Sequence, residues 1–234
     1  MISTTLILVS GIAGLLQLGR WAARRAAAAT NPELVKQLWY QPAALAFVVA
    51  LVLANRLLHP EAPNVFRVGD LQSPVFGLGV LGVVDGSSWS SIVATVIGIP
   101  LIVTTVVVYR QTLRGRTVHW KLAPTAFLLS IAFSFVNSLT EELLFRVVSI
   151  EGLTGHLADA MIVLICAVAF GVPHYFGNPG GLVGMIMAGF LGWLMATSIQ
   201  QTGGLAVAWA IHFAQDVPII GFLLISSASR RLVG

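Results

Sequence analysis

The stretch LAPTAFLLSIAFSFVNSLTEELLFRVVSI, residues 122–150, contains a long uncharged run followed by two glutamates and an arginine within apolar sequence. About 20 apolar residues are enough for a helix to cross the hydrocarbon of a bilayer. The run 122–140 therefore predicts a membrane-spanning helix that continues through the charged residues to Ile150. Each charge near the centre of such a helix costs about 2.5–3.5 kcal/mol on insertion scales, so these residues are expected to face the protein interior and to have a function.

The composition of the whole chain agrees with this interpretation. Of 234 residues, 57% are hydrophobic and 9% are charged, whereas a soluble domain carries roughly 25% charged residues. A soluble globular protein is therefore excluded, and the long apolar runs favour helices over an outer-membrane barrel. The single cysteine, Cys166, excludes an intramolecular disulfide and a cysteine metal cluster. The net charge of +4 comes from short basic clusters beside apolar segments, which is typical of membrane flanks and predicts no nucleic-acid partner.

Hydrophobic segments long enough to cross a bilayer recur along the chain. We expect spans at 2–18, 38–58, 91–109, 122–140, 158–174, 181–199 and 204–226. The apolar run 76–84 is too short to span and is expected to be re-entrant, interfacial or an extension of the third span. The predicted fold class is an all-α, polytopic transmembrane helical bundle of about seven spans, with eight as the alternative.

Basic residues indicate the orientation of the bundle. With seven spans, ten of the thirteen lysines and arginines fall on one side: Arg20, Arg24, Arg25, Lys36, Arg110, Arg114, Arg116, Lys121, Arg230 and Arg231. The positive-inside rule places that side in the cytoplasm. The N-terminus is then expected outside and the C-terminus in the cytoplasm.

Four-residue spacing places side chains in the segment NSLTEELLFR, residues 137–146, on shared helix faces. Glu142 and Arg146 are four apart and can form an ion pair, which leaves Glu141 as the uncompensated acid. An isolated pair of this kind is more often structural than catalytic. Asn137 lies four residues before Glu141. It is expected either to form hydrogen bonds between helices or to orient that glutamate.

The segments FGVPHYFGN, residues 170–178, and AIHFAQD, residues 210–216, carry further ionisable residues in apolar sequence. His212 and Asp216 are four apart and can form a carboxylate–imidazole pair, which would fix the tautomer of the histidine. The same spacing places the ring of Phe170 beneath His174. Pro173 removes a backbone hydrogen bond and is expected to kink or end its helix.

Helix geometry allows these residues to share one site. At 1.5 Å per residue, Glu142, His174 and His212 fall within about 10 Å of one another along the membrane normal. Glu142 lies in the outer half of the bilayer in the predicted orientation. We therefore expect substrates to enter nearer the non-cytoplasmic face.

The order and spacing of these residues resemble the signature motifs of a known family. Glu141–Glu142–x3–Arg146, Phe170–x3–His174 and His212–x3–Asp216 are similar to the three motifs of the CPBP intramembrane proteases. That family includes the type II CAAX prenyl endopeptidases and the Abi bacteriocin-processing or immunity proteins. The resemblance covers roughly residues 122–220. It divides the chain into N-terminal transmembrane helices at 1–121, a catalytic core at 122–226 and a cytoplasmic tail at 227–234, all within one membrane domain.

The resemblance implies peptide-bond hydrolysis within the bilayer, with a membrane protein or peptide as substrate. It assigns the activation of water to Glu141 and His174, and the support of the oxyanion to His212 and Asp216. The remaining motif-related residues have supporting roles: Glu142, Arg146, Phe170 and Asn137.

The last motif position departs from the eukaryotic enzymes, which have asparagine where this chain has Asp216. An ionised carboxylate cannot donate a hydrogen bond to an oxyanion. Asp216 would therefore donate only when protonated, or would instead orient His212. The aspartate form resembles the bacterial branch of the family, which argues against prenylated CAAX substrates and predicts a location in the bacterial inner membrane.

Other functions use the same residue types. Glu141, His174 and His212 are also the ligand set of a catalytic zinc with an open position for water, but they lack the HExxH spacing that makes a zinc site specific. Direct activation of water is favoured, and a divalent metal remains the alternative. A proteolytically silent scaffold, a bacteriocin-immunity protein and a proton-coupled transporter are further alternatives. The intact motifs oppose the first two, and the lack of similar halves opposes a transporter.

Overall fold

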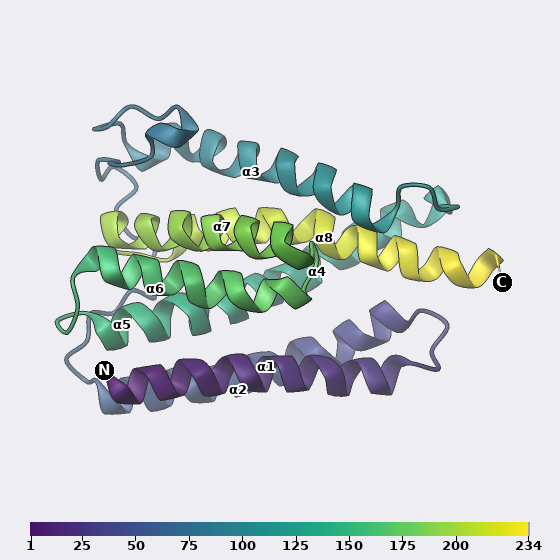
Figure 1. The fold of residues 1–234 in the computed structure, drawn as a ribbon, viewed down its shortest axis with the longest axis horizontal. Helices are drawn as coiled ribbons and strands as arrows, with labels where there is room; N and C mark the ends of the chain where they lie inside the picture. Colours follow the sequence, from purple (N-terminus) through teal and green to yellow (C-terminus); the bar gives the residue numbers. More distant parts are fainter. Residues whose placement is uncertain (234) are drawn as a thin grey trace.

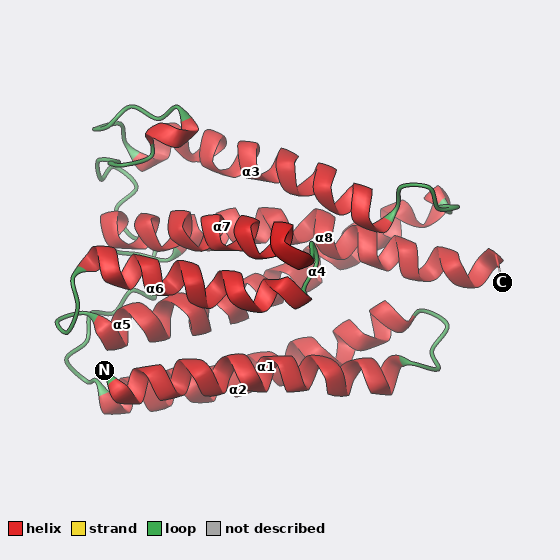
Figure 2. Ribbon diagram, viewed as in Figure 1, coloured by secondary structure: helices red, strands yellow, loops and turns green. Residues whose placement is uncertain are grey.

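Helices make up the regular structure in the computed structural model of the chain, which describes the backbone of residues 1–233 and the side chains of residues 1–230. Figure 2 shows these helices and the loops between them, and the described residues form no β-strand. Seven of the described helical segments are long and apolar enough to cross a membrane, which confirms the predicted all-α transmembrane fold. The side chain of Arg231 and all of Gly234, which belong to the predicted cytoplasmic tail, lie outside the described residues.

The segments follow one another in this order: α1 (Ile2–Ala26), α2 (Pro32–Leu58), η1 (Gly79–Leu81), α3 (Trp89–Thr112), η2 (Trp120–Leu122), α4 (Ala123–Glu142), η3 (Leu143–Val148), α5 (Ser149–Leu153), α6 (Asp159–Gly171), η4 (Val172–Phe176), α7 (Gly181–Thr202) and α8 (Ala206–Val233).

The long helices run up and down along one axis (Figure 1). α1 packs on α2, α6 packs on α7, and α8 lies against both α3 and α4. The two termini lie at opposite ends of the bundle. The connections 27–31 and 113–119 lie at the end that carries the C-terminus, whereas 59–88 and 203–205 lie at the end that carries the N-terminus. The two basic clusters that flank α1 and α3 therefore share one end, which we call the basic end.

Local sequence explains where several helices begin and end. The Asn31 side chain accepts a hydrogen bond from the backbone of Leu34 and caps α2, and Pro32 occupies its first turn. Ser88 caps α3 in the same way by accepting from the backbone of Ser91. Gly203 ends α7 with a φ of 71°, a left-handed conformation that favours glycine. These local signals are enough to determine where the helices begin and end.

Glycines bring α6 and α7 close together. A Cβ added at Gly171 would lie 2.9 Å from the carbonyl oxygen of Met185, and one added at Gly192 would lie 2.9 Å from the Cα of Ala167. Small residues allow membrane helices to approach in this way. The turn between these two helices lies part-way along the bundle, while α1, α4 and α8 continue toward the basic end (Figure 1).

The fourth span contains a π-helical segment in its second half. The sequence predicts one α-helix from 122 to Ile150, but α4 ends at Glu142 and the six residues of η3 follow with wider turns before α5 begins. All six side chains of η3 are buried. Such π-helical turns occur frequently at functional sites, and this one follows the two adjacent glutamates directly.

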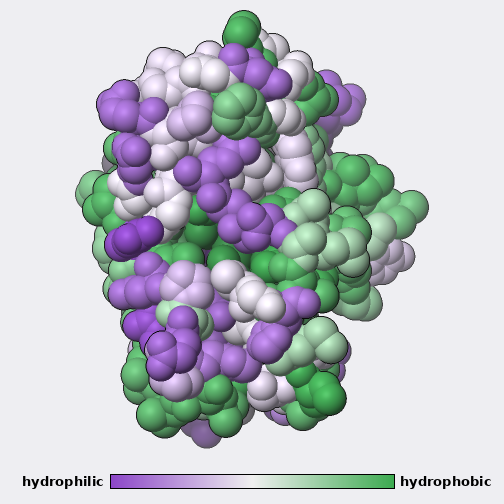
Figure 3. Space-filling model, turned by 90° about the vertical axis from the view of Figure 1, so that its left-hand side faces the viewer, coloured by the Kyte–Doolittle hydropathy of each residue, from purple (hydrophilic) through white to green (hydrophobic). Residues whose placement is uncertain are grey.

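The short apolar run 76–84 does not form an eighth span. It contains only the three-residue η1 and holds Leu78 buried while Val80 and Val84 are exposed. This segment lies at the end of the molecule that carries the N-terminus, and Figure 3 shows hydrophilic residues spread over that end with hydrophobic residues around its margin. The last helix, α8, continues past the predicted end of its span at 226 to Val233.

Candidate active site

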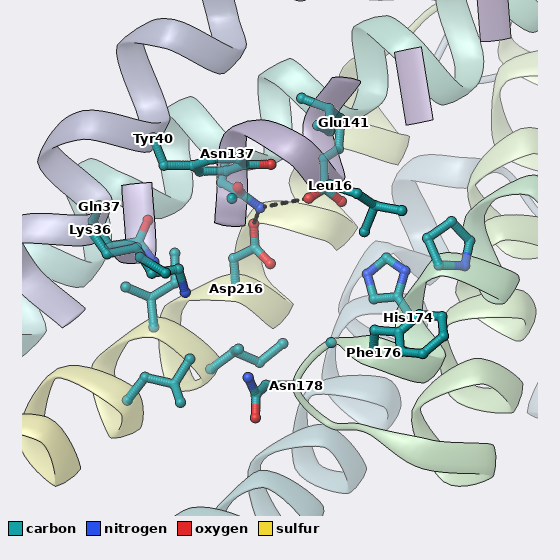
Figure 4. A pocket seen from close by; sticks show the side chains of 18 of the residues that line it. Leu16, Lys36, Gln37, Tyr40, Asn137, Glu141, His174, Phe176, Asn178 and Asp216 are labelled. Atoms are coloured by element: carbon teal, nitrogen blue, oxygen red, sulfur yellow. Dashed lines mark hydrogen bonds between the residues drawn. The ribbon is translucent and has the colours of Figure 1, made fainter. Parts of the chain in front are cut away.

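A cavity of about 540 Å³ brings together side chains from six helical elements of the bundle. Figure 4 shows these side chains around the cavity. Its polar lining comes from α2, α4, η4 and the adjoining loop, and α8: Lys36, Gln37, Tyr40, Asn137, Glu141, His174, Asn178 and Asp216. Its apolar lining includes Ile12, Leu15, Leu16, Phe145, Ile219 and Leu223. Three of the four residues predicted to be catalytic, Glu141, His174 and Asp216, therefore face one cavity.

The lining of this cavity extends toward the basic end of the bundle. Arg20 and Ala23 near the end of α1, and Lys36 near the start of α2, belong to it. The turn between α6 and α7 lies part-way along the bundle, whereas α1, α4 and α8 continue toward the basic end (Figure 1). The sequence predicts substrate entry nearer the opposite face from the depth of Glu142 alone. That prediction does not take the short turn between α6 and α7 into account.

Glu141 is held by the amide of Asn137. The Nδ2 atom of Asn137 donates to Oε1 of Glu141 at 3.2 Å and to Oδ2 of Asp216 at 3.1 Å. The first of these contacts is the one that the four-residue spacing predicts. The other oxygen of Glu141, Oε2, has no hydrogen-bond partner among the described residues. One oxygen of this carboxylate is thus fixed, and the other is available to a water molecule.

Glu142 has two partners, and the sequence predicts only one of them. Its Oε1 lies 3.0 Å from Nη1 of Arg146, and both side chains are fully buried. The same oxygen lies 2.7 Å from Nδ1 of His212, which reaches it from α8. Sequence reasoning missed this contact because the two residues belong to separate helices.

The pair that the spacing predicts between His212 and Asp216 is present as a long ionic contact, without a hydrogen bond. Nε2 of His212 lies 3.7 Å from Oδ1 of Asp216 and 3.6 Å from Oε2 of Glu141, and both distances exceed those of a hydrogen bond. Glu142 therefore fixes the orientation of the ring, while Nε2 points toward the two other carboxylates. Because the carboxylate of Glu142 accepts a hydrogen bond from Nδ1, Nδ1 is the protonated nitrogen in this contact.

His174 is oriented by the backbone of its own segment. Its Nδ1 lies 2.6 Å from the carbonyl oxygen of Phe170, which can only accept, so Nδ1 carries the proton. The neutral ring then has its free lone pair on Nε2. Pro173 lacks an N–H, and α6 changes at Val172 from an α-helix to the 3₁₀ turns of η4. The helix therefore ends where Pro173 predicts.

The ring of Phe170 contacts side chains from all three motifs. Its centroid is 4.4 Å from that of His174 and 5.2 Å from that of His212. The guanidinium carbon of Arg146 lies 4.1 Å from the same ring, close enough for a cation–π contact. Phe145 packs against it edge-on with centroids 5.1 Å apart. Phe170 thus separates the two histidines and keeps water away from the ion pair of Arg146.

The candidate ligands do not form a metal site in the described part of the chain. No three histidine, cysteine, aspartate or glutamate side chains there converge as the ligands of one ion would. The set of Glu141, His174 and His212 is included in this finding.

The second helix supplies residues that sequence reasoning missed. Tyr40 lines the cavity, whereas the adjacent Trp39 is exposed. Gln37 lines the cavity as well and bonds to Gln41, one turn further on. The available signal was the pair of glutamines spaced four apart in an apolar span.

Comparison with known proteins agrees with the motifs. Residues 123–218 match the family model of the type II CAAX prenyl endopeptidase Rce1-like proteins. No curated protein and no solved structure matches the chain. The matched segment contains Glu141, His174 and His212, and this family points to a protease. Residues 123–218 of this integral membrane protein are therefore similar to the Rce1-like type II CAAX prenyl endopeptidase family.

Proposed function

We propose that the protein is an intramembrane endopeptidase that hydrolyses a peptide bond in a membrane-inserted protein or peptide. The observation that carries this proposal is that Glu141 and His174, each with one unengaged acceptor atom, line the same cavity. Hydrolysis of an amide needs a base for water, an acid for the leaving amine and a donor for the oxyanion. The residues around this cavity can supply all three.

The proposed reaction uses Glu141 as both base and acid. Water binds between Oε2 of Glu141 and Nε2 of His174 and gives its proton to the carboxylate as its oxygen bonds to the carbonyl carbon. The carbonyl oxygen becomes an oxyanion in the tetrahedral intermediate. When the carbon–nitrogen bond breaks, Glu141 returns the proton to the departing nitrogen. Acid–base catalysis of this kind typically contributes about 10²–10⁴-fold.

The oxyanion donor in this mechanism is His212. With Nδ1 bonded to Glu142, its Nε2 is the nitrogen left for the substrate, and it donates when the ring carries both protons. Asp216 accepts from Asn137 and lies on the same side of the ring. We therefore assign Asp216 a positioning role, because an ionised carboxylate has no proton to offer to an oxyanion.

The walls of the cavity indicate the class of substrate. Apolar side chains from α1 and α8 line it beside the polar centre, so an apolar peptide segment is the matching ligand. We propose that the substrate enters from the bilayer on the side of the basic end. By the positive-inside rule that end faces the cytoplasm, and we propose a bacterial inner membrane as the location.

Reconstitution of the full chain into proteoliposomes tests this function. The probe is a mixture of synthetic peptides, each with a hydrophobic segment of about 20 residues, and mass spectrometry detects new termini. We expect the wild-type chain to produce defined fragments and Glu141→Gln to produce almost none. Equal cleavage by both, or cleavage by neither, would count against the proposal.

The same cleavage assay after treatment with a chelator distinguishes direct activation of water from a metal-dependent mechanism. Activity that survives dialysis against a chelator supports direct activation of water by Glu141 and His174. Activity that is lost and then restored by zinc would replace this mechanism with a metal-dependent one.

A further inference from the structure

A line of polar side chains connects the start of α2 with the catalytic carboxylates. Glu33, Gln37 and Gln41 are spaced four apart and therefore share one face of the helix. Nε2 of Gln37 donates to Glu33 at 2.7 Å, and Nε2 of Gln41 donates to Oε1 of Gln37 at 2.8 Å. Nε2 of Gln41 also donates to Oδ1 of Asn137 at 3.2 Å. Asn137 in turn donates to Glu141 and Asp216.

The two ends of this line determine how its amides are turned. An ionised carboxylate only accepts hydrogen bonds, whereas each amide has one accepting oxygen and one donating nitrogen. Gln37 must therefore turn its nitrogen toward Glu33, and Asn137 must turn its nitrogen toward the catalytic carboxylates. The oxygens of both amides then point at the same residue. Gln41 is that residue, and the two N–H groups of its amide satisfy both oxygens.

Because the amides of this line are buried, each of them needs a hydrogen-bond partner within the protein. The exposed fraction of Gln41 is 3% and that of Gln37 is 6%, so no bulk water is at hand to replace a missing donor. The oxygen of Gln41 has no hydrogen-bond partner among the described residues, which means that turning this amide around would leave two further oxygens without a donor. Leaving a buried polar group unpaired is unfavourable in an apolar interior.

The first turn of α2 is bonded to α8. Pro42 lies inside the helix, and Figure 1 shows the part of α2 before it rising away from α1. The backbone N–H of Glu33 donates to Ser227 of α8 at 3.2 Å. Glu33 is also paired with Lys36 at 3.2 Å, which places an ion pair at the outer end of the line.

We propose that Gln41 is a positioning residue for catalysis, which keeps Asn137 turned as the donor shared by Glu141 and Asp216. The proposal rests on the proposed function, because it assigns Glu141 to the reaction. Gln41 does not line the cavity and lies outside the matched segment 123–218. It acts on the reaction only through Asn137.

Replacement of Gln41 by methionine removes both donors at nearly constant size. The matched control is Asn55→Leu, since Asn55 is a fully buried amide of the same helix that donates to the carbonyl of Val148, remote from the cavity. On the peptide cleaved fastest by the wild-type chain, we expect Gln41→Met to lower kcat about 10-fold. KM should stay within about twofold because Gln41 does not contact the substrate, and Asn55→Leu should leave kcat unchanged.

A double-mutant cycle distinguishes positioning from general destabilisation. In the Asn137→Ala background, Gln41→Met should lower kcat no further, because the residue through which it acts is already absent. Additive losses in kcat, or an equal loss in the Asn55→Leu control, would overturn the proposal.

Unfolding temperatures give a readout that needs no substrate. The effects of Gln41→Met and Asn137→Ala should be less than additive, whereas those of Asn55→Leu and Asn137→Ala should add. If no peptide is cleaved, the proposed function fails while this coupling still tests the bridge. Fully additive unfolding temperatures for the first pair would show that Gln41 does not hold Asn137.

Discussion

Oε1 of Glu142 lies 2.7 Å from Nδ1 of His212 and so joins the first motif to the third. The same oxygen contacts Nη1 of Arg146 at 3.0 Å. A buried ion pair within one helix therefore also sets the position of a ring on another helix. The two adjacent glutamates differ in this respect, because Glu141 has only Asn137 as a hydrogen-bond donor among the described residues.

Removal of either partner of the buried pair should destabilise the fold. Breaking such a pair leaves an uncompensated buried charge and costs about 3–5 kcal/mol. Glu142→Ala and Arg146→Ala should therefore both lower the unfolding temperature and the yield of folded protein. Glu142→Ala should in addition lower the cleavage rate per folded molecule, since it alone frees His212. Glu61→Ala, at an exposed loop position, serves as the control. A wild-type unfolding temperature for Glu142→Ala would contradict the assignment.

Glu141→Gln should separate catalysis from stability. The amide keeps the shape of the side chain and an oxygen that can accept from Asn137, but it cannot take the proton of water. We expect a near-normal unfolding temperature and a loss of cleavage of roughly 10²–10⁴-fold. Parallel melting and cleavage measurements on Glu141→Gln and Glu142→Gln check this. If Glu142→Gln is stable and inactive while Glu141→Gln cleaves normally, the roles of the two residues are reversed.

Contacts within one helix were predictable from the sequence. The pairs Glu142–Arg146 and Asn137–Glu141 are four residues apart, and both are in contact. Helical geometry places residues four apart near one face whatever surrounds them. The number of spans was predictable for a similar reason, because the thickness of the hydrocarbon fixes the length of an apolar helix.

Contacts between helices were not predictable in this way. The spans are apolar on most sides, so their hydrophobic pattern does not determine how each is rotated about its axis. His212 consequently forms its hydrogen bond with Glu142 on another helix and makes only a longer ionic contact with its own neighbour Asp216. The contribution of Gln41 to the site likewise depends on how α2 leans on α4.

The orientation of the bundle can be tested with reporter fusions. The termini lie at opposite ends of the described structure, and the connection at 113–119 lies at the same end as the C-terminus. By the positive-inside rule we expect reporters at Gly115 and after the last residue to be cytoplasmic. A reporter at the N-terminus should be outside. Reporters at Gly115 and the C-terminus on opposite sides would contradict the seven-span arrangement.

We expect the stability of the fold to depend on pH through His59, which lies at the end of the bundle opposite the basic end. It follows α2, and its Nε2 lies 3.1 Å from Ser3 Oγ and 3.0 Å from Thr4 Oγ1. Burial, the N-terminal amino group and His156 lower the pKa of this ring below its ordinary value. The unfolded chain therefore binds the proton more readily than the folded chain.

The stability linked to this group is complete above the ordinary histidine pKa of about 6.5 and is lost as the pH falls below it. We expect the unfolding temperature to fall between about pH 7 and about pH 5 and His59→Gln to make this fall smaller. Melting curves across that range provide the measurement. An unchanged slope in the variant would show that His59 is not responsible.

The role of Asp216 is tested by restoring the residue of the eukaryotic enzymes. Asp216→Asn keeps an oxygen that can accept from Nδ2 of Asn137, which the carboxylate now does at 3.1 Å. It also places an amide donor on the side of the ring where Nε2 of His212 lies 3.7 Å away. Because a positioning residue needs the acceptor and not the charge, most of the cleavage activity should remain. Asp216→Leu, which offers Asn137 no acceptor, should lower kcat by a further factor of about 10. Complete inactivation by Asp216→Asn at normal protein levels would instead show that the carboxylate itself takes part in the reaction.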